Sequence, residues 1–208
     1  MIAPFLDEAS YFRDKNSRDP ETRFWGTRAG QNARFSAILR HMPFKGARIL
    51  DVGCGTGDFL TFAIEQGVAP ERYIGIDILP EFIDEARGRA LPGGEFHALD
   101  VLAPGWVPPP NIDFVVANGL FALRQPDDGW WSRYRLITDR FWSWALKGVA
   151  YTLVSRHSTG NSAETQYCDP GEILNDAATR FGPWTVVDHS YLINDFVVAA
   201  FKSSRSAI

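Results

Sequence analysis

ILDVGCGTGDFL, residues 49–60, joins an apolar run to a helical pattern through glycines at positions 53, 55 and 57. A glycine loop between a strand and a helix can bind an anion through its backbone N–H groups. A dinucleotide fingerprint, however, requires its last glycine where this chain has Asp58. Asp51 and Asp58 flank the loop, so a pyrophosphate would meet two carboxylates. The loop therefore favours a ligand other than a dinucleotide.

The composition sets limits on partners and location. The 208 residues, 45% of them hydrophobic, suffice for one globular domain. A formal net charge of -4 argues against nucleic acid as a partner. The acids Asp7 and Glu8 exclude a signal peptide, and no apolar run reaches about 18 residues. We expect a cytoplasmic protein without a membrane partner, while the choice between monomer and homodimer stays open.

The cysteines predict neither a disulfide framework nor a metal centre. Only Cys54 and Cys168 are present, one in the glycine loop and one far downstream. Their separation matches no metal-ligand spacing, so we expect two free thiols and no metal.

From residue 46 onward, short apolar runs alternate with helical patterns, as is typical of a parallel sheet flanked by helices. The expected strands are 47–53, 72–78, 94–101, 112–120, 148–155, 184–190 and 194–202. The expected helices are 57–67, 80–90, 130–147 and 169–181, with Asp58 and Asp169 placed as caps. The last two strands follow closely enough to form a hairpin. Residues 1–45 predict one or two helices outside the sheet, most clearly at 30–42.

The acids around the loop indicate an adenosine cofactor with a positive charge. Asp77 ends the second expected strand 20 residues after Gly57, which is the spacing of a carboxylate that accepts ribose hydroxyls. S-adenosylmethionine has a ribose, no phosphate, and cationic ammonium and sulfonium groups that carboxylates attract. Its own carboxylate can use N–H groups at the helix start. These residues favour S-adenosylmethionine, with S-adenosylhomocysteine as product, over NAD.

Four runs in order, ILDVGCGTGDFL, YIGIDILPEFIDEAR, FHALDV and IDFVVANGLFAL, together resemble the early motifs of a known family. The family is the Rossmann-fold (class I) S-adenosylmethionine-dependent methyltransferases of the small bacterial type. The resemblance covers residues 47–155 and, through the closing hairpin, the rest of the sheet. It implies a three-layer α/β fold with a mostly parallel seven-stranded sheet and an antiparallel last strand. A helical extension, residues 1–45, would precede the methyltransferase domain, residues 46–208.

The resemblance also implies which residues bind the cofactor. It assigns Asp77 to the ribose, Asp100 to the adenine amino group, and Asn118 with Gly119 to the methionine part. An Asp at a strand end can also serve only as a turn former, which is an open alternative for Asp100. The full expected set is Trp25, Arg28, Gln31, Asp51, Gly53, Cys54, Gly55, Asp77, Ile78, Asp100, Val101, Asn118 and Gly119.

The segment FWGTRAGQNARF, residues 24–35, resembles a stretch that small bacterial methyltransferases carry ahead of the glycine loop. Its glycines allow bends, Trp25 offers a rigid face, and Arg28 and Gln31 provide donors for the cofactor carboxylate. We therefore expect a lid here. The alternative is that Trp25 only anchors an N-terminal helix on the sheet.

The acceptor is expected to be a small molecule. Enzymes that methylate amines or amides often follow the fourth strand with Asn or Asp, prolines and an aromatic residue, whereas this chain has NGLF at 118–121. Methylation of a cytosine ring carbon requires a cysteine nucleophile in this region, and neither cysteine lies near it in the sequence. Tyr11, Phe121 and Tyr191 are the expected acceptor-binding residues, because they fall in segments near the sheet's ligand-binding rim. Methylation of RNA or protein, and a non-catalytic cofactor-binding module, stay as alternatives.

Methyl transfer is a direct displacement, so positioning of the acceptor can supply most of the catalysis. If the acceptor must lose a proton, His157 is the first candidate base because it follows the fifth expected strand. Asp195 is the second candidate and His189 the third. A histidine in a loop can equally be solvated and idle.

Overall fold

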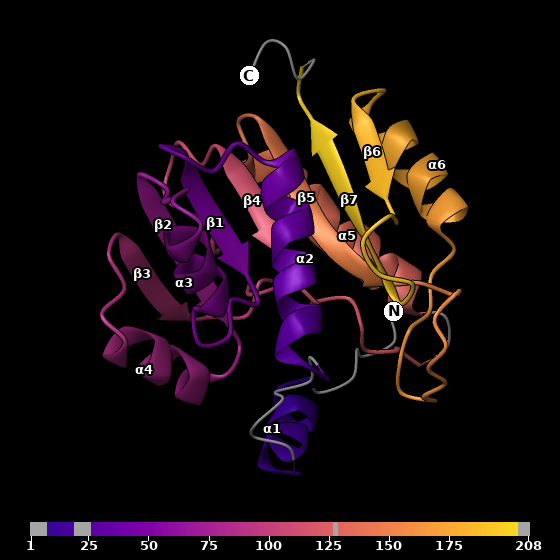
Figure 1. The fold of residues 1–208 in the computed structure, drawn as a ribbon, viewed down its shortest axis with the longest axis horizontal. Coiled ribbons are helices and arrows are strands. Elements are labelled where there is room, and N and C mark those ends of the chain that lie inside the picture. Colours follow the sequence, from indigo (N-terminus) through magenta and orange to yellow (C-terminus); the bar gives the residue numbers. More distant parts are fainter. Residues whose placement is uncertain (1–7, 19–25, 127–128, 204–208) are drawn as a thin grey trace.

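The computed structural model describes residues 8–18, 26–126 and 129–203. Its centre is a seven-stranded sheet in the order β3-β2-β1-β4-β5-β7-β6 (Figure 1). The strands are β1 (Arg48–Val52), β2 (Arg72–Asp77), β3 (Gly94–Ala98), β4 (Phe114–Ala117), β5 (Gly148–Val154), β6 (Thr185–Asp188) and β7 (Asp195–Phe201). β7 is antiparallel to β5 and β6, and the remaining pairs are parallel. The predicted fold class and the closing hairpin are therefore confirmed.

Helices cover both faces of the sheet. They are α1 (Glu8–Arg18), α2 (Arg28–His41), α3 (Asp58–Glu65), α4 (Pro80–Gly88), α5 (Gly129–Trp144) and α6 (Pro170–Phe181). α2, α3 and α4 pack on one face, and α5 and α6 pack on the other. Figure 1 shows α1 apart from both layers, beyond the ends at which the parallel strands finish. No helix in the described ranges is long and apolar enough to cross a membrane.

The central strands are apolar throughout because both of their faces are covered. In β1, Ile49 belongs to the apolar cluster under α2, α3 and α4, and the next residue, Leu50, belongs to the cluster under α5 and α6. The aromatic residues of α5 pack mainly into the second cluster, where Trp130 and Tyr134 are buried and their rings stack. They are core residues, as aromatic residues at helical spacing usually are.

The helix starts agree with the sequence except at α3. Asp169 caps α6, where its Oδ1 accepts the N–H groups of Gly171 and Glu172. The prediction that Asp58 caps α3 is wrong, because the cap position is Gly57, whose φ of 81° is left-handed. Asp58 is already the first helical residue, and its carboxylate forms an ion pair with Arg89 at 2.7 Å instead.

Gly148 at the start of β5 tests how tightly the sheet is packed. A Cβ at Gly148 would lie 2.5 Å from the carbonyl oxygen of Ala200 on the paired strand, which cannot move aside without breaking the pairing. We expect Gly148→Ala to lower the free energy of unfolding by about 1–3 kcal/mol in urea denaturation. Gly88→Ala at the end of α4 is the control, since a Cβ there meets nothing within 4 Å. Equal unfolding free energies for wild type and Gly148→Ala would contradict the expectation.

Candidate active site

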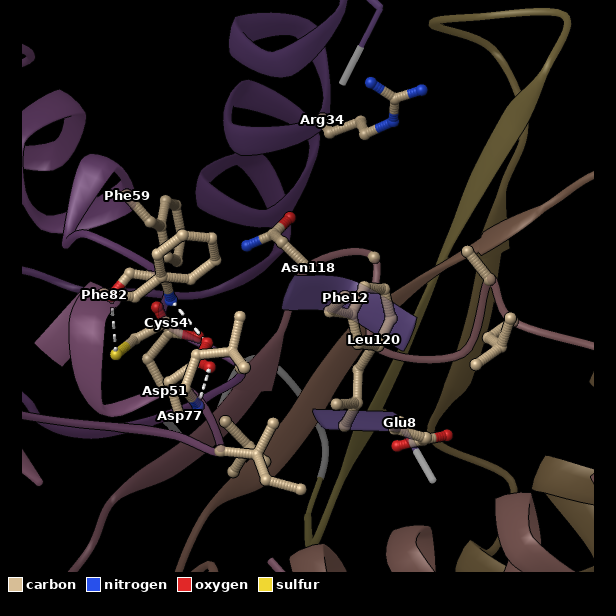
Figure 2. Close-up of a pocket in the computed structure, with 18 of the residues that line it drawn as sticks. Glu8, Phe12, Arg34, Asp51, Cys54, Phe59, Asp77, Phe82, Asn118 and Leu120 are labelled. Atoms are coloured by element: carbon tan, nitrogen blue, oxygen red, sulfur yellow. Dashed lines mark hydrogen bonds between the residues drawn. The ribbon is translucent and has the colours of Figure 1, made fainter. Parts of the chain in front are cut away.

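A cavity of about 360 Å³ lies where β1, β2 and β4 end, between the sheet and α1. On one side of β1 lie β2 and β3, which follow it in the sequence, and on its other side lies β4. The strand order therefore reverses direction at β1, and the cavity lies at this topological switch point of the sheet. Its volume is typical of a site for a small ligand. Figure 2 shows Asp51, Cys54 and Asp77 together on the glycine-loop side, with Glu8 and Phe12 reaching in from α1.

The glycine loop turns sharply between β1 and α3. Gly53, Gly55 and Gly57 all have positive φ angles, of 75°, 55° and 81°, which only glycine adopts without strain. The N–H groups of Gly53 and Cys54 donate to the carbonyl oxygen of Ile76 at 2.8 and 3.1 Å. The loop is thereby held against the end of β2, and Gly53, Cys54 and Gly55 all line the cavity.

Asp77 ties together the loops that follow β1 and β2. Its Oδ2 accepts the N–H of Gly55 and its Oδ1 accepts the N–H of Leu79, both at 2.9 Å. Burial raises the pKa of Asp77 above its ordinary value, and the two backbone N–H groups limit the rise. An ionised carboxylate has about four acceptor positions. Asp77 lines the cavity, so the remaining positions can receive hydroxyl donors from a ligand.

Asp51 is the most deeply buried acid in the cavity wall, with 1% of its surface exposed. Its Oδ2 accepts a hydrogen bond from the Tyr73 hydroxyl, and its Oδ1 has no partner among the described residues. Burial raises the pKa of Asp51 to about 7, against the lowering effect of the Tyr73 hydrogen bond. A cation at this point would stabilise the ionised carboxylate.

Asn118 directly follows β4 and has a buried amide without partners among the described residues. The residue is 7% exposed and lines the cavity, yet neither Oδ1 nor Nδ2 has a hydrogen-bond partner within the described ranges. An unpaired buried polar group costs about 1–3 kcal/mol, so such an amide fits a ligand that both donates and accepts. The N–H of the neighbouring Gly119 donates to Thr152 Oγ1 at 2.9 Å, which fixes the turn.

Three further residues of the expected cofactor-binding set also line the cavity. Ile78, Asp100 and Val101 lie along its wall after β2 and β3. Asp100 forms a turn as well, because its Oδ1 accepts the N–H of Leu102 at 2.8 Å. Turn formation and ligand contact are therefore compatible at this position.

The predicted N-terminal lid is only partly found at residues 24–35. Trp25 lies outside the described residues. Arg28 has a side chain that is 70% exposed and does not line the cavity, whereas Gln31 is buried in the cavity wall. Gln31 Nε2 donates to Asp58 Oδ2 at 3.2 Å. Among the described residues, α1 also contributes to the cavity wall.

Asp58 does not offer a free charge to the ligand. Burial acts to raise its pKa, but hydrogen bonds from Arg89 and Gln31 outweigh this and hold the pKa below its ordinary value. Arg28 lies 3.5 Å away as a second basic partner. Within the described ranges, the acids near the glycine loop that form no ion pair are therefore Asp51 and Asp77, not the pair that flanks the loop in sequence.

Of the three predicted acceptor contacts, only Tyr11 reaches the cavity. Its hydroxyl donates to Glu164 Oε2 at 2.8 Å across the opening. Phe121 is buried in the core against Tyr134 and Tyr151, because the turn after β4 directs Leu120 to the cavity instead. Tyr191 packs beside the apolar cluster on the opposite face of the sheet and is not part of the cavity wall.

The candidate bases separate in the same way. His157 is exposed outside the cavity wall, where its ring lies 5.9 Å from that of His189. Asp195 is buried in the wall at the start of β7, and its Oδ2 accepts a 2.6 Å hydrogen bond from Arg34 Nη2. Asp195 begins β7 opposite the end of β5, at the same rim, but the loop after β5 carries His157 away from the opening.

Three cavity residues of α1, Glu8, Phe12 and Lys15, were not predicted from the sequence. Together with the predicted Tyr11 they line the cavity, and their spacing of three and four residues places them on one face of a helix. That spacing was the available signal. Arg34 and Arg133 also line the cavity, but their helical patterns show only that they belong to α2 and α5.

Comparison with known proteins agrees with this geometry. Residues 49–135 match the family described as "Methyltransferase domain". Ribosomal protein L11 methyltransferase of Tolumonas auensis is 37% identical over 81 residues, or 38% of this chain and 27% of that protein. Magnesium-protoporphyrin O-methyltransferase of Rhodobacter capsulatus is 33% identical over 109 residues, or 49% of this chain and 46% of that protein. The chain thus spans less than half the length of either relative.

A solved structure extends the likeness to nearly the whole fold. The structure described as "DhpI-SAM-HEP complex" matches with a TM-score of 0.70 and 18% sequence identity. The aligned region covers 92% of this chain and 94% of the chain in that structure. The sheet order, the glycine loop and the matched domain define a Rossmann-like fold of the methyltransferase type. Residues 49–135 match a methyltransferase domain, and the chain as a whole has the Rossmann-like fold of the class I S-adenosylmethionine-dependent methyltransferases.

The buried carboxyl of Asp51 predicts a pH dependence of stability. Its pKa is raised from 3.8 to about 7, so between these values the folded protein holds a proton that the unfolded chain has lost. The free energy of unfolding should therefore fall as pH rises from about 4 to about 7. Asp51→Asn cannot ionise, and urea denaturation should show the variant gaining on wild type across this window. A difference that is independent of pH would contradict the shift.

Proposed function

We propose that this protein binds S-adenosylmethionine and transfers its methyl group to a small molecule. The observation that carries the proposal is the meeting of Asp51, Asp77 and Asn118 in one cavity at the switch point of the sheet. The unpartnered Oδ1 of Asp51 and the unpartnered amide of Asn118 fit a ligand end that carries both a cation and an acceptor. The ammonium and carboxylate of a methionine group have that chemistry.

Each part of the cofactor has matching residues in the cavity. We assign its ammonium to Asp51, its carboxylate to the Asn118 amide, and its ribose hydroxyls to Asp77. Asp100 would accept the adenine amino group, with Ile78 and Val101 beside the ring. When bound, the cofactor supplies a methyl group on a sulfonium, which a nucleophile can attack directly.

The side of the cavity away from the proposed cofactor position is the proposed acceptor site. Phe12, Leu120 and Leu123 give it an apolar wall, and the Arg34 to Asp195 pair gives it a polar one. The protein's contribution is to hold the nucleophile in line with the methyl group and to exclude water. Asp195 is the predicted base that reaches this wall, so it is our candidate to accept a proton there, with Arg34 holding its carboxylate in place.

A small acceptor is supported by the way α1 covers the opening. Tyr11 and Phe12 of α1 line the cavity, so α1 restricts the approach of a folded macromolecule to the reacting centre. The net charge of -4 also disfavours nucleic acid. One relative acts, by its name, on magnesium-protoporphyrin and another on a ribosomal protein, so a protein acceptor is the outcome to test against.

Calorimetry tests the cofactor assignment. We expect S-adenosylhomocysteine to bind with one-to-one stoichiometry and NAD not to bind. Asp77→Ala should weaken this binding by about 1–3 kcal/mol, because the ribose loses charge-assisted acceptors. Asp84→Ala on the exposed surface of α4 is the control and should bind like wild type. Binding of NAD without S-adenosylhomocysteine would overturn the proposal.

Labelled cofactor tests the acceptor class. S-adenosylmethionine with a labelled methyl group is incubated with the protein and separate fractions of metabolites, bulk tRNA and extract proteins. We expect label in the metabolite fraction, because the covered cavity admits a small nucleophile. Label only in protein or tRNA would contradict a small acceptor, and no transfer to any fraction would favour a non-catalytic binding module.

A further inference from the structure

A buried arginine on α5 fastens α1 over the cavity. Arg133 is 5% exposed, and its Nη2 donates to the Glu8 carboxylate. Gln125 Nε2 donates to the other oxygen of the same carboxylate at 2.9 Å. Both donors lie more than 100 residues from Glu8 in the sequence. The first residue of α1 is therefore docked by polar contacts with the body of the protein.

The Glu8 and Arg133 pair lines the same cavity as the residues that we assign to the adenine. Glu8, Arg133, Asp100 and Val101 all line the same cavity. Asp100 acts electrostatically on both members of the pair. Burial raises the pKa of Glu8, Arg133 lowers it, and the negative charge of Asp100 raises it further. Burial in turn lowers the pKa of Arg133, while Glu8 and then Asp100 oppose that effect.

A buried guanidinium needs a carboxylate partner. Arginine stays protonated in proteins, and leaving its charge buried without a partner is strongly unfavourable. Glu8 is the acid that holds Arg133 in the structure. If Glu8 were neutral or withdrawn with α1, Asp100 is the other acid whose charge acts on Arg133.

We propose that Arg133 is a positioning residue of the cofactor site. Paired with Glu8, it leaves the Asp100 carboxylate free to accept the adenine amino group. Without Glu8, it pairs with Asp100 and withdraws that acceptor from the adenine. This inference rests on the proposed binding of S-adenosylmethionine. Docking of α1 and binding of the adenine then favour each other by the same factor, as linkage requires.

The readout is discrimination at the adenine amino group. Calorimetry compares S-adenosylhomocysteine with S-inosylhomocysteine, in which a carbonyl oxygen replaces the amino group. Wild type should prefer the amino compound by about 10-fold or more, since the analogue leaves the Asp100 carboxylate unpaired. Glu8→Gln keeps the side-chain size but removes the charge. The preference of this variant should fall to about 2-fold or less, through weaker binding of S-adenosylhomocysteine.

Two further variants separate positioning from a merely structural role. Arg13→Gln removes an exposed contact between α1 and Glu81 and should leave the preference unchanged. Glu8→Gln combined with Arg133→Gln removes both charges, so Asp100 is free again and the preference should return even though α1 has lost its pair. Circular dichroism confirms that each variant is folded.

Each outcome bears on one claim. A wild-type preference in Glu8→Gln, or no recovery in the double variant, would overturn the inference. Equal binding of both compounds by wild type would also overturn it, because Asp100 would then not contact the amino group, while the proposed cofactor binding would stand. Binding of neither compound by wild type would contradict the proposed function itself.

Discussion

The site depends on one carboxylate that joins two loops. Asp77 accepts an N–H from the glycine loop through one oxygen and an N–H from the start of α4 through the other. The loop after β1 and the loop after β2 are thus fixed relative to each other by the protein alone. Because the loops are already fixed, the protein loses less conformational entropy when a ligand binds, which favours affinity.

The charges of the cavity divide into two groups. Near the glycine loop, Asp51 and Asp77 form no ion pair with the residues that the structure describes, and Asp51 is costly to ionise there. On the acceptor side, each cation has an acid beside it, as Arg34 has Asp195. A positively charged cofactor therefore relieves an unfavourable excess of negative charge at one end, while the other end is already balanced.

Long-range ion pairs decide how the N-terminal helices sit. Arg34 on α2 pairs with Asp195 on β7, and Glu8 on α1 pairs with Arg133 on α5. Both pairs are largely buried, so losing either partner would leave an uncompensated charge. They connect the first helices to the last third and the middle of the chain. Within the described residues, α1 thus lines the cavity together with Gln31 and Arg34 of the segment at 24–35 that local sequence patterns favoured.

Local patterns determined the order of strands and helices, the glycine loop and the positions of Asp51, Asp77 and Asn118, because each depends on neighbouring residues and on the fixed topology of a parallel sheet. Tertiary packing alone decided the rest. Phe121 enters the core while Leu120 faces the cavity, and Asp195 reaches the wall while His157 stays exposed. These choices depend on which side chain fills the space against distant elements, and on charges that lie more than 100 residues apart in the sequence. No local spacing encodes such contacts.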